Sequence, residues 1–130
     1  MPTHIPIDSY TNAPYEVVPK ATIHPSVELH DHAHDTTHYL LPTVFSVEKG
    51  TEFVVRYPGP GVFYFTDGEM KYEDVQNPRF HNTVKAGSVL HVDEGSVLRW
   101  HCNTDAGCKG FLAFYVPVSV KSTEEFLVTE

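Results

Sequence analysis

The 130-residue sequence has little basic charge and no long apolar run. Nine Lys and Arg stand against 17 Asp and Glu, which leaves a net charge of −8. Because this charge repels phosphate backbones and anionic lipid headgroups, we expect neither a nucleic-acid nor a membrane partner. No apolar stretch reaches the roughly 18 residues of a membrane span, and Met1–Tyr10 lacks the features of a secretory signal. The sequence therefore predicts a soluble, cytoplasmic protein.

Cysteine is also scarce. Cys102 and Cys108 are the only two, and the polar stretch Asn103–Gly107 between them looks like a hairpin tip. A disulfide across this stretch is geometrically possible. Without a secretion signal, however, we expect two free thiols in or beside a strand pair.

Apolar side chains, in contrast, are plentiful enough for one core. They make up 41% of the chain and include eight Phe and seven Tyr. A chain of this length fits a single domain, and this core can close without help from metal or disulfide.

The chain divides into an N-terminal arm over residues 1–43, a strand-rich core over 44–118 and a tail over 119–130. The first 27 residues are interrupted by prolines, which favours edge strands that wrap the core and excludes a helix. From residue 44 onward, short β-branched and aromatic runs alternate with glycine-containing turns, which predicts an all-β jelly-roll barrel. The expected strands are Val44–Val47, Glu52–Tyr57, Val62–Thr66, Glu69–Glu73, His81–Val84, Ser88–Val92, Val97–Cys102 and Phe111–Val116.

Two short motifs predict local structure, one within the strand-rich core and one in the tail. Asp67-Gly68 has the composition of a tight hairpin turn, so we expect the chain to reverse there. Ser122 and Glu125 have the spacing of a capping box, which predicts a short helical cap in the tail.

The segment Gly87-x5-Asp93-x-Gly95 matches the second cupin motif, with Asp93 where proline is usual. Together with Phe45–Gly50, Phe63–Lys71 and Val84–Trp100, it makes the chain resemble the RmlC-like cupins, and among them the small ethanolamine-utilisation (EutQ-like) cupins of fungi. This resemblance covers about residues 44–117. It implies a single-domain cupin barrel, a double-stranded β-helix, with its site inside.

The resemblance also locates the positions at which metal-binding cupins place three His and one Glu. The second-motif histidine position is occupied by Leu98 and the glutamate position by Gly61. The His-x-His pair falls at Val54 and Arg56, or at Val55 and Tyr57. None of these side chains is an expected ligand, so we expect the usual metal centre to be absent and no cofactor to be bound.

Histidine is frequent near the N-terminus and offers an alternative. His30, His32 and His34 alternate along one run, so on an extended strand they share a face and would be able to hold a transition metal. A solvated loop at the barrel rim is the simpler interpretation. If the cluster does bind metal, the protein is a metal-dependent cupin, either a dioxygenase or an isomerase.

Candidate site residues follow from the strand pattern. His91 lies in a strand that lines the cavity of cupins and would serve as general acid or base, with Arg56 holding an oxyanion. If the register of that strand is shifted by one, Tyr57 points inward instead and Arg56 is solvated. The remaining residues expected to bind substrate are Phe63, Phe65, Trp100 and Tyr115.

These residues suggest a small-molecule cupin enzyme that catalyses metal-independent acid–base chemistry: an isomerase, epimerase, dehydratase or cyclase acting on an oxygenated metabolite. A non-catalytic binding or assembly module is the other alternative. We also expect a homodimer, because an exposed sheet face and edge strands are more stable when a second subunit covers them, with residues 1–27 contributing.

Overall fold

The computed structural model describes residues 2, 4–11, 14–24 and 37–128. Strands make up most of it, together with one short α-helix and one 3-10 helix. The elements are α1 (Ile7–Thr11), β1 (Tyr15–Val18), β2 (Ala21–Ile23), β3 (His38–Val47), β4 (Glu52–Arg56), β5 (Gly61–Asp74), β6 (His81–Lys85), β7 (Val89–Val92), β8 (Val97–His101), β9 (Cys108–Pro117) and η1 (Thr123–Phe126).

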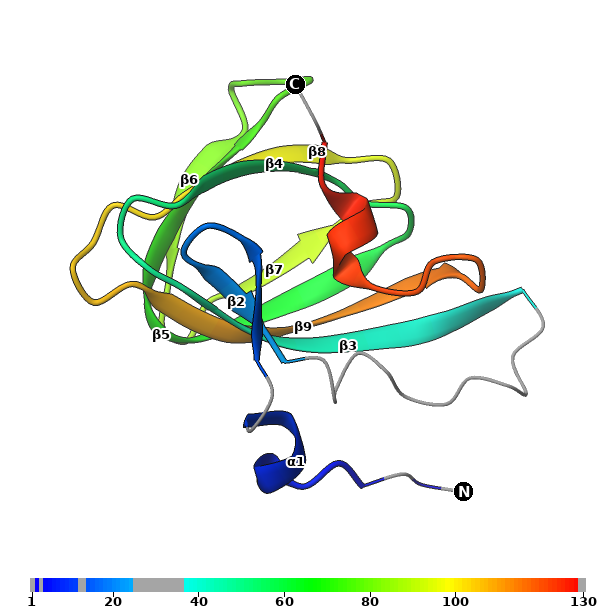
Figure 1. Ribbon diagram of the computed structural model, residues 1–130. Helices are drawn as coiled ribbons and strands as arrows, with labels where there is room; N and C mark the ends of the chain where they lie inside the picture. The colour runs from blue at the N-terminus through cyan, green and yellow to red at the C-terminus, as the bar shows by residue number, and fades with distance from the viewer. Residues whose placement is uncertain (1, 3, 12–13, 25–36, 129–130) are drawn as a thin grey trace.

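All strand pairs are antiparallel and follow the order β1-β2-β3-β9-β5-β8-β4, with β6 and β7 also pairing with β5. Figure 1 looks along the barrel that these strands form, with η1 beside its opening and β1 and β2 in front. The predicted all-β cupin barrel is confirmed. Neither described helix is long or apolar enough to cross a bilayer.

β5 joins the two halves of the barrel. Its first part pairs with β7 and β9, and its second part pairs with β6 and β8. The hairpin expected at Asp67-Gly68 is therefore wrong. The chain instead continues through a register shift between Phe65 and Asp67. Gly68 has φ +72°, and a Cβ there would lie 1.8 Å from the Gly107 carbonyl oxygen. The glycine thus serves a bulge inside a strand rather than a turn.

The N-terminal arm contains the expected edge strands, since β1 pairs with β2 and β2 pairs with β3. Two expectations fail here. The arm does hold a helix, α1, because Pro6 precedes its first turn, where a missing N–H costs nothing. β3 begins at His38, six residues before the expected start at Val44, and pairs with β9 along its whole length.

The tail forms the predicted cap, as a 3-10 helix. Ser122 and Glu125 make the capping box in both directions. Phe126 follows and is 4% exposed, and Val128 donates its N–H to the Val54 carbonyl at 2.9 Å. The tail therefore closes the free edge of β4 and inserts an aromatic ring at the opening of the barrel.

Both cysteines are buried and free, as predicted. Burial, reinforced by neighbouring Cys102 and two carboxylates, raises the pKa of the Cys108 thiol to about 12. The thiol is therefore protonated and unreactive in the folded protein.

Candidate ligand-binding site

The inner face of β4 and β8 forms one wall of the barrel interior. Phe53 pairs with Trp100 and Val55 pairs with Leu98, so these side chains share a face. The alternation continues to Tyr57, which is 2% exposed, whereas Arg56 points outward and is exposed. Of the two registers considered for this strand, the structure has the one with Tyr57 inside.

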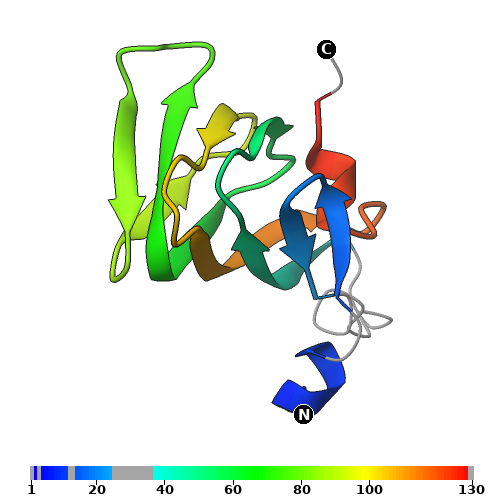
Figure 2. The ribbon, with the colours of Figure 1, turned by 60° about the vertical axis from the view of Figure 1, so that its left-hand side comes forward.

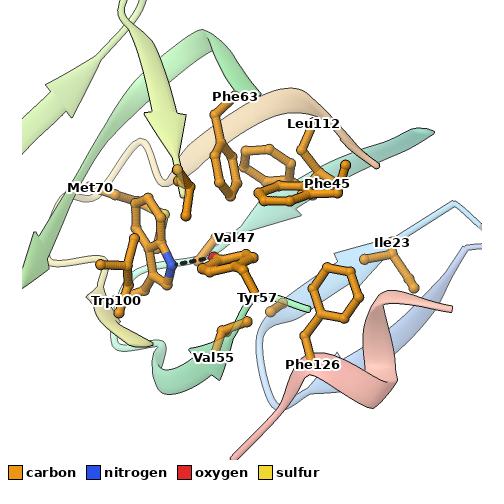
Figure 3. Packing of buried hydrophobic residues seen from close by; sticks show 14 of the residues in the cluster. Ile23, Phe45, Val47, Val55, Tyr57, Phe63, Met70, Trp100, Leu112 and Phe126 are labelled. Carbon is orange, nitrogen blue, oxygen red and sulfur yellow. Dashed lines mark hydrogen bonds between the residues drawn. The ribbon is translucent and has the colours of Figure 1, made fainter. Parts of the chain in front are cut away.

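The opposite wall comes from β5 and β9. Phe63 and Phe65 both point inward as predicted, and their rings stack at 5.6 Å between centroids. Phe63 also packs against Trp100 at 5.2 Å and edge-on to Tyr57 at 6.0 Å. Figure 3 shows Phe63, Trp100 and Tyr57 converging from different strands on one centre. Four of the expected substrate-binding residues thus meet inside the barrel.

A cavity of about 70 Å³ remains within this cluster, between the two walls, the β1–β2 hairpin and η1. The described residues that line it are almost all apolar, and none of them is charged or a histidine. Thr22 and Thr123 belong to this lining and are partly exposed. Within the described lining, Tyr57 is therefore the one buried residue with a hydroxyl group.

The Tyr57 hydroxyl is held in place by its neighbours. The Trp100 Nε1–H donates to it at 2.8 Å (Figure 3). The Tyr57 ring also stacks on Phe114, with 4.7 Å between the ring centroids. Burial raises the pKa of Tyr57 well above its usual range, so the phenol stays protonated. Among the described residues its own proton meets no acceptor, because the bond from Trp100 uses only an oxygen lone pair. The hydroxyl is therefore available as a donor inside an apolar cavity.

His91 does not belong to this site. It lies on β7, as expected, but it is exposed, while Leu90 and Val92 take the inward positions of that strand. Its pairing with Val62 confirms that it lies on the outer face of the sheet. The expected placement of His91 in the cavity is wrong because a cavity-lining strand presents only every second residue inward.

Two other expected site residues also lie outside. Arg56 is exposed for the reason given above. Tyr115 is 47% exposed and stacks on His38 at 5.1 Å, because its neighbours Phe114 and Val116 fill the inward positions of β9. Neither side chain is in a position to touch a molecule in the cavity.

The positions of the usual cupin metal ligands do not fit a metal. A Cβ on Gly61 would lie 2.3 Å from the Phe114 ring, so an aromatic side chain fills the space of the expected carboxylate. Leu98, Val55 and Tyr57 occupy the other positions and are buried in the core cluster. Within the described residues, no group of three His, Cys, Asp or Glu side chains is arranged to hold a metal. His30, His32 and His34 lie outside the described residues.

Sequence reasoning missed three aromatic residues of the cavity lining, namely Phe45, Phe53 and Phe126. Phe53 was detectable, because alternation along β4 places it on the same face as Val55 and Tyr57. Phe126 packs edge-on to Tyr57 at 5.8 Å and to Phe114 at 5.9 Å. The one sequence feature that indicated burial of Phe126 is its position directly after the capping box.

No family model and no curated protein matches the sequence. Solved structures do share its fold. The putative ethanolamine utilization protein EutQ of Salmonella typhimurium has a TM-score of 0.55 at 12% identity, over 73% of this chain and 68% of that chain. KdgF of Halomonas sp. has 0.57 at 10% identity, over 78% of this chain and 86% of that one.

A third similar structure is the DMSP lyase DddQ of Ruegeria pomeroyi, with a TM-score of 0.54 at 12% identity. The match covers 62% of this chain but only 40% of the lyase chain. The predicted resemblance to cupin barrels, EutQ among them, is confirmed at the level of the fold.

Proposed function

We propose that this chain binds a small, largely apolar molecule inside the barrel, with one hydrogen-bond acceptor of the ligand facing Tyr57. The observation that carries the proposal is the buried Tyr57 hydroxyl, whose proton has no acceptor among the described residues. A donor left without an acceptor in an apolar interior costs about 1–3 kcal/mol. A carbonyl or ether oxygen of a ligand would remove that cost.

The lining limits the chemistry of the ligand. Because no charged side chain is found among the described lining residues, that lining offers nothing to compensate a carboxylate, a phosphate or several hydroxyl groups. The oxygen-rich metabolite expected from the sequence therefore fits poorly. A cavity of about 70 Å³ is also several-fold smaller than the 300–1,000 Å³ common for ligand pockets, so the ligand has few heavy atoms unless Phe126 moves aside.

Catalysis is the second candidate, favoured by the fold shared with a protein named as a lyase. In that case Tyr57 would stabilise an oxygen that gains negative charge while keeping its own proton. The isomerase, epimerase, dehydratase and cyclase reactions suggested by the sequence also need a group that accepts a proton. None of the described lining residues is a histidine, an acidic residue or a lysine, and His91 and Arg56 lie outside the cavity. Binding is therefore our first choice.

The test compares two ligands of nearly equal shape, cyclopentanone and methylenecyclopentane, of which only the ketone has an acceptor. Ligand-observed NMR titration should show the ketone binding about 3–10-fold more tightly, the worth of one hydrogen bond.

Two variants identify the donor. Trp100→Phe keeps the Tyr57 hydroxyl, so the preference for the ketone should persist. Tyr57→Phe/Trp100→Phe removes both buried polar atoms, so the preference should disappear. If neither ligand binds, or if the double variant still prefers the ketone, the proposal is wrong.

A further inference from the structure

Five large hydrophobic side chains lie exposed on one side of the sheet. We call them the outer patch: Leu40, Tyr64, Val89, Phe111 and Tyr115, with exposed fractions between 39% and 61%. They come from β3, β9, β5 and β7, which are neighbours in the sheet. Leu40 pairs with Tyr115, and Tyr64 pairs with both Phe111 and Val89. Register thus places all five on the outer face, as one continuous surface.

The rows between the patch residues hold no acidic residue among those that the structure describes, although the chain has 17 of them. The acidic residues of this face lie at its edges, with Asp67 opposite Lys109 and Glu16 opposite Thr22. The positions between the patch residues are filled by Pro42, Val44, Val62 and Ala113. We call the positions of these four residues and of His91, which pairs with Val62, the middle rows. His91 is the one ionisable residue described in them. Two copies with a net charge of −8 repel each other over most of their surfaces, so a neutral apolar face is where they approach at least cost.

The helix α1 provides a second observation on the same side. Figure 1 shows it set apart beyond β3, on the side of the sheet away from the barrel interior. None of its residues is buried, and Ile7 is 62% exposed. Among the described residues, one connection of α1 to the barrel is a 2.8 Å hydrogen bond from His24 Nδ1 to the Tyr10 carbonyl, with the two rings packed edge-on. A five-residue helix is not stable alone in water, so α1 needs further packing.

We propose that the outer patch is the interface of a homodimer, in which two copies face each other across a two-fold axis and each α1 packs at the edge of the partner's sheet. A stable interface covers about 800 Å² on each partner. With aromatic side chains offering about 150–250 Å² each, the exposed parts of the patch supply roughly half of that. The smaller residues between them and α1 supply the rest.

A second copy suits this face better than a charged partner. An apolar, uncharged surface is complementary to itself under two-fold symmetry, whereas a partner bearing a strong charge would find no opposite charge to pair with in the middle rows. The proposal does not depend on the ligand proposed for the cavity, because the two sites lie on opposite faces of the sheet.

The test is sedimentation equilibrium of the full chain at about 10–100 µM, a concentration range in which interfaces of this size associate. We expect twice the chain mass of 14.6 kDa. Tyr64→Glu/Phe111→Glu places four carboxylates in the interface and should raise the dissociation constant by about 100-fold or more. Ile7→Glu should raise it less, because α1 lies at the edge.

The matched control is Phe80→Glu. Phe80 is 54% exposed and lies near the β5–β6 turn, which projects away from the barrel on the side opposite α1 (Figure 2). This variant should remain dimeric, and circular dichroism should show all three variants folded. A wild-type protein that stays monomeric up to 100 µM, or a dimer that survives Tyr64→Glu/Phe111→Glu, would overturn the proposal.

Discussion

The two faces of the sheet formed by β3, β9 and β5 differ less in composition than in what covers them. Adjacent residues on β5 show this: Phe65 is 0% exposed on the inner face and Tyr64 is 48% exposed on the outer face. An antiparallel sheet with one solvated face normally alternates apolar and polar residues. Here both faces are apolar, so hydrophobicity alone does not distinguish a ligand cavity from an interface between chains.

The largest expected effect tests this difference within one strand. Phe65→Ala removes a buried ring that contacts Phe45 and Trp100, and we expect it to lower the free energy of unfolding by about 3–5 kcal/mol. Tyr64→Ala removes a ring that its own chain leaves half exposed, and should cost less than about 1 kcal/mol in the monomer. Urea denaturation at dilute protein concentration measures both.

The two variants should separate in a second measurement. Tyr64→Ala weakens dimerisation, while Phe65→Ala leaves the outer patch intact and, where folded, still dimerises. Equal losses of stability from the two substitutions would mean that the faces are not covered as the structure shows.

A smaller effect is expected from the ionisable groups of the inner face. Burial raises the pKa of Cys108 from 9.0 to about 12 and raises the pKa of Tyr57 well above its ordinary value of 10.0. As pH rises above 9, the unfolded chain loses these protons while the folded chain keeps them. Stability is therefore greatest below pH 9 and falls between pH 9 and 12, by at most about 1.4 kcal/mol per pH unit for each group.

Variants assign this alkaline loss to its source. Cys108→Ala should remove the part of the slope that begins near pH 9, and Tyr57→Phe the part that begins near pH 10. An unchanged slope in Cys108→Ala would contradict the burial of the thiol.

The fold could be predicted largely from sequence because its signals are local. Glycine-bounded β-branched runs located most of the strands, and the capping box located η1. The two failures have different causes, one local and one long-range. Asp67-Gly68 has the same composition in a bulge as in a turn, and the start of β3 depends on its pairing with β9, which lies some 70 residues further along the chain.

The site was predictable only where its register was known. Phe63, Phe65 and Trp100 were placed correctly because the inward and outward alternation of their strands was counted from cupin motif positions. His91 was assigned to a cavity-lining strand without counting which residues of that strand point inward. For Tyr115 no such count was made. The cavity itself also depends on Phe126 and the β1–β2 hairpin, which reach it from the two ends of the chain. No periodic pattern in the sequence predicts that these two segments contact the same cavity.

The smallest expected effects come from the two residues first expected to be catalytic. Arg56→Ala should change the free energy of unfolding by less than about 0.5 kcal/mol, because the side chain is exposed and no salt bridge to it is found among the described residues. His91→Ala should leave ketone affinity within about two-fold of wild type, since a residue on the far face of the sheet makes no hydrogen bond to the ligand. Tyr57, the neighbour of Arg56 that faces inward and lines the cavity, serves as the comparison in the same NMR titration. A loss of ketone binding in Arg56→Ala or His91→Ala as large as that in a Tyr57 variant would place the binding site outside the barrel.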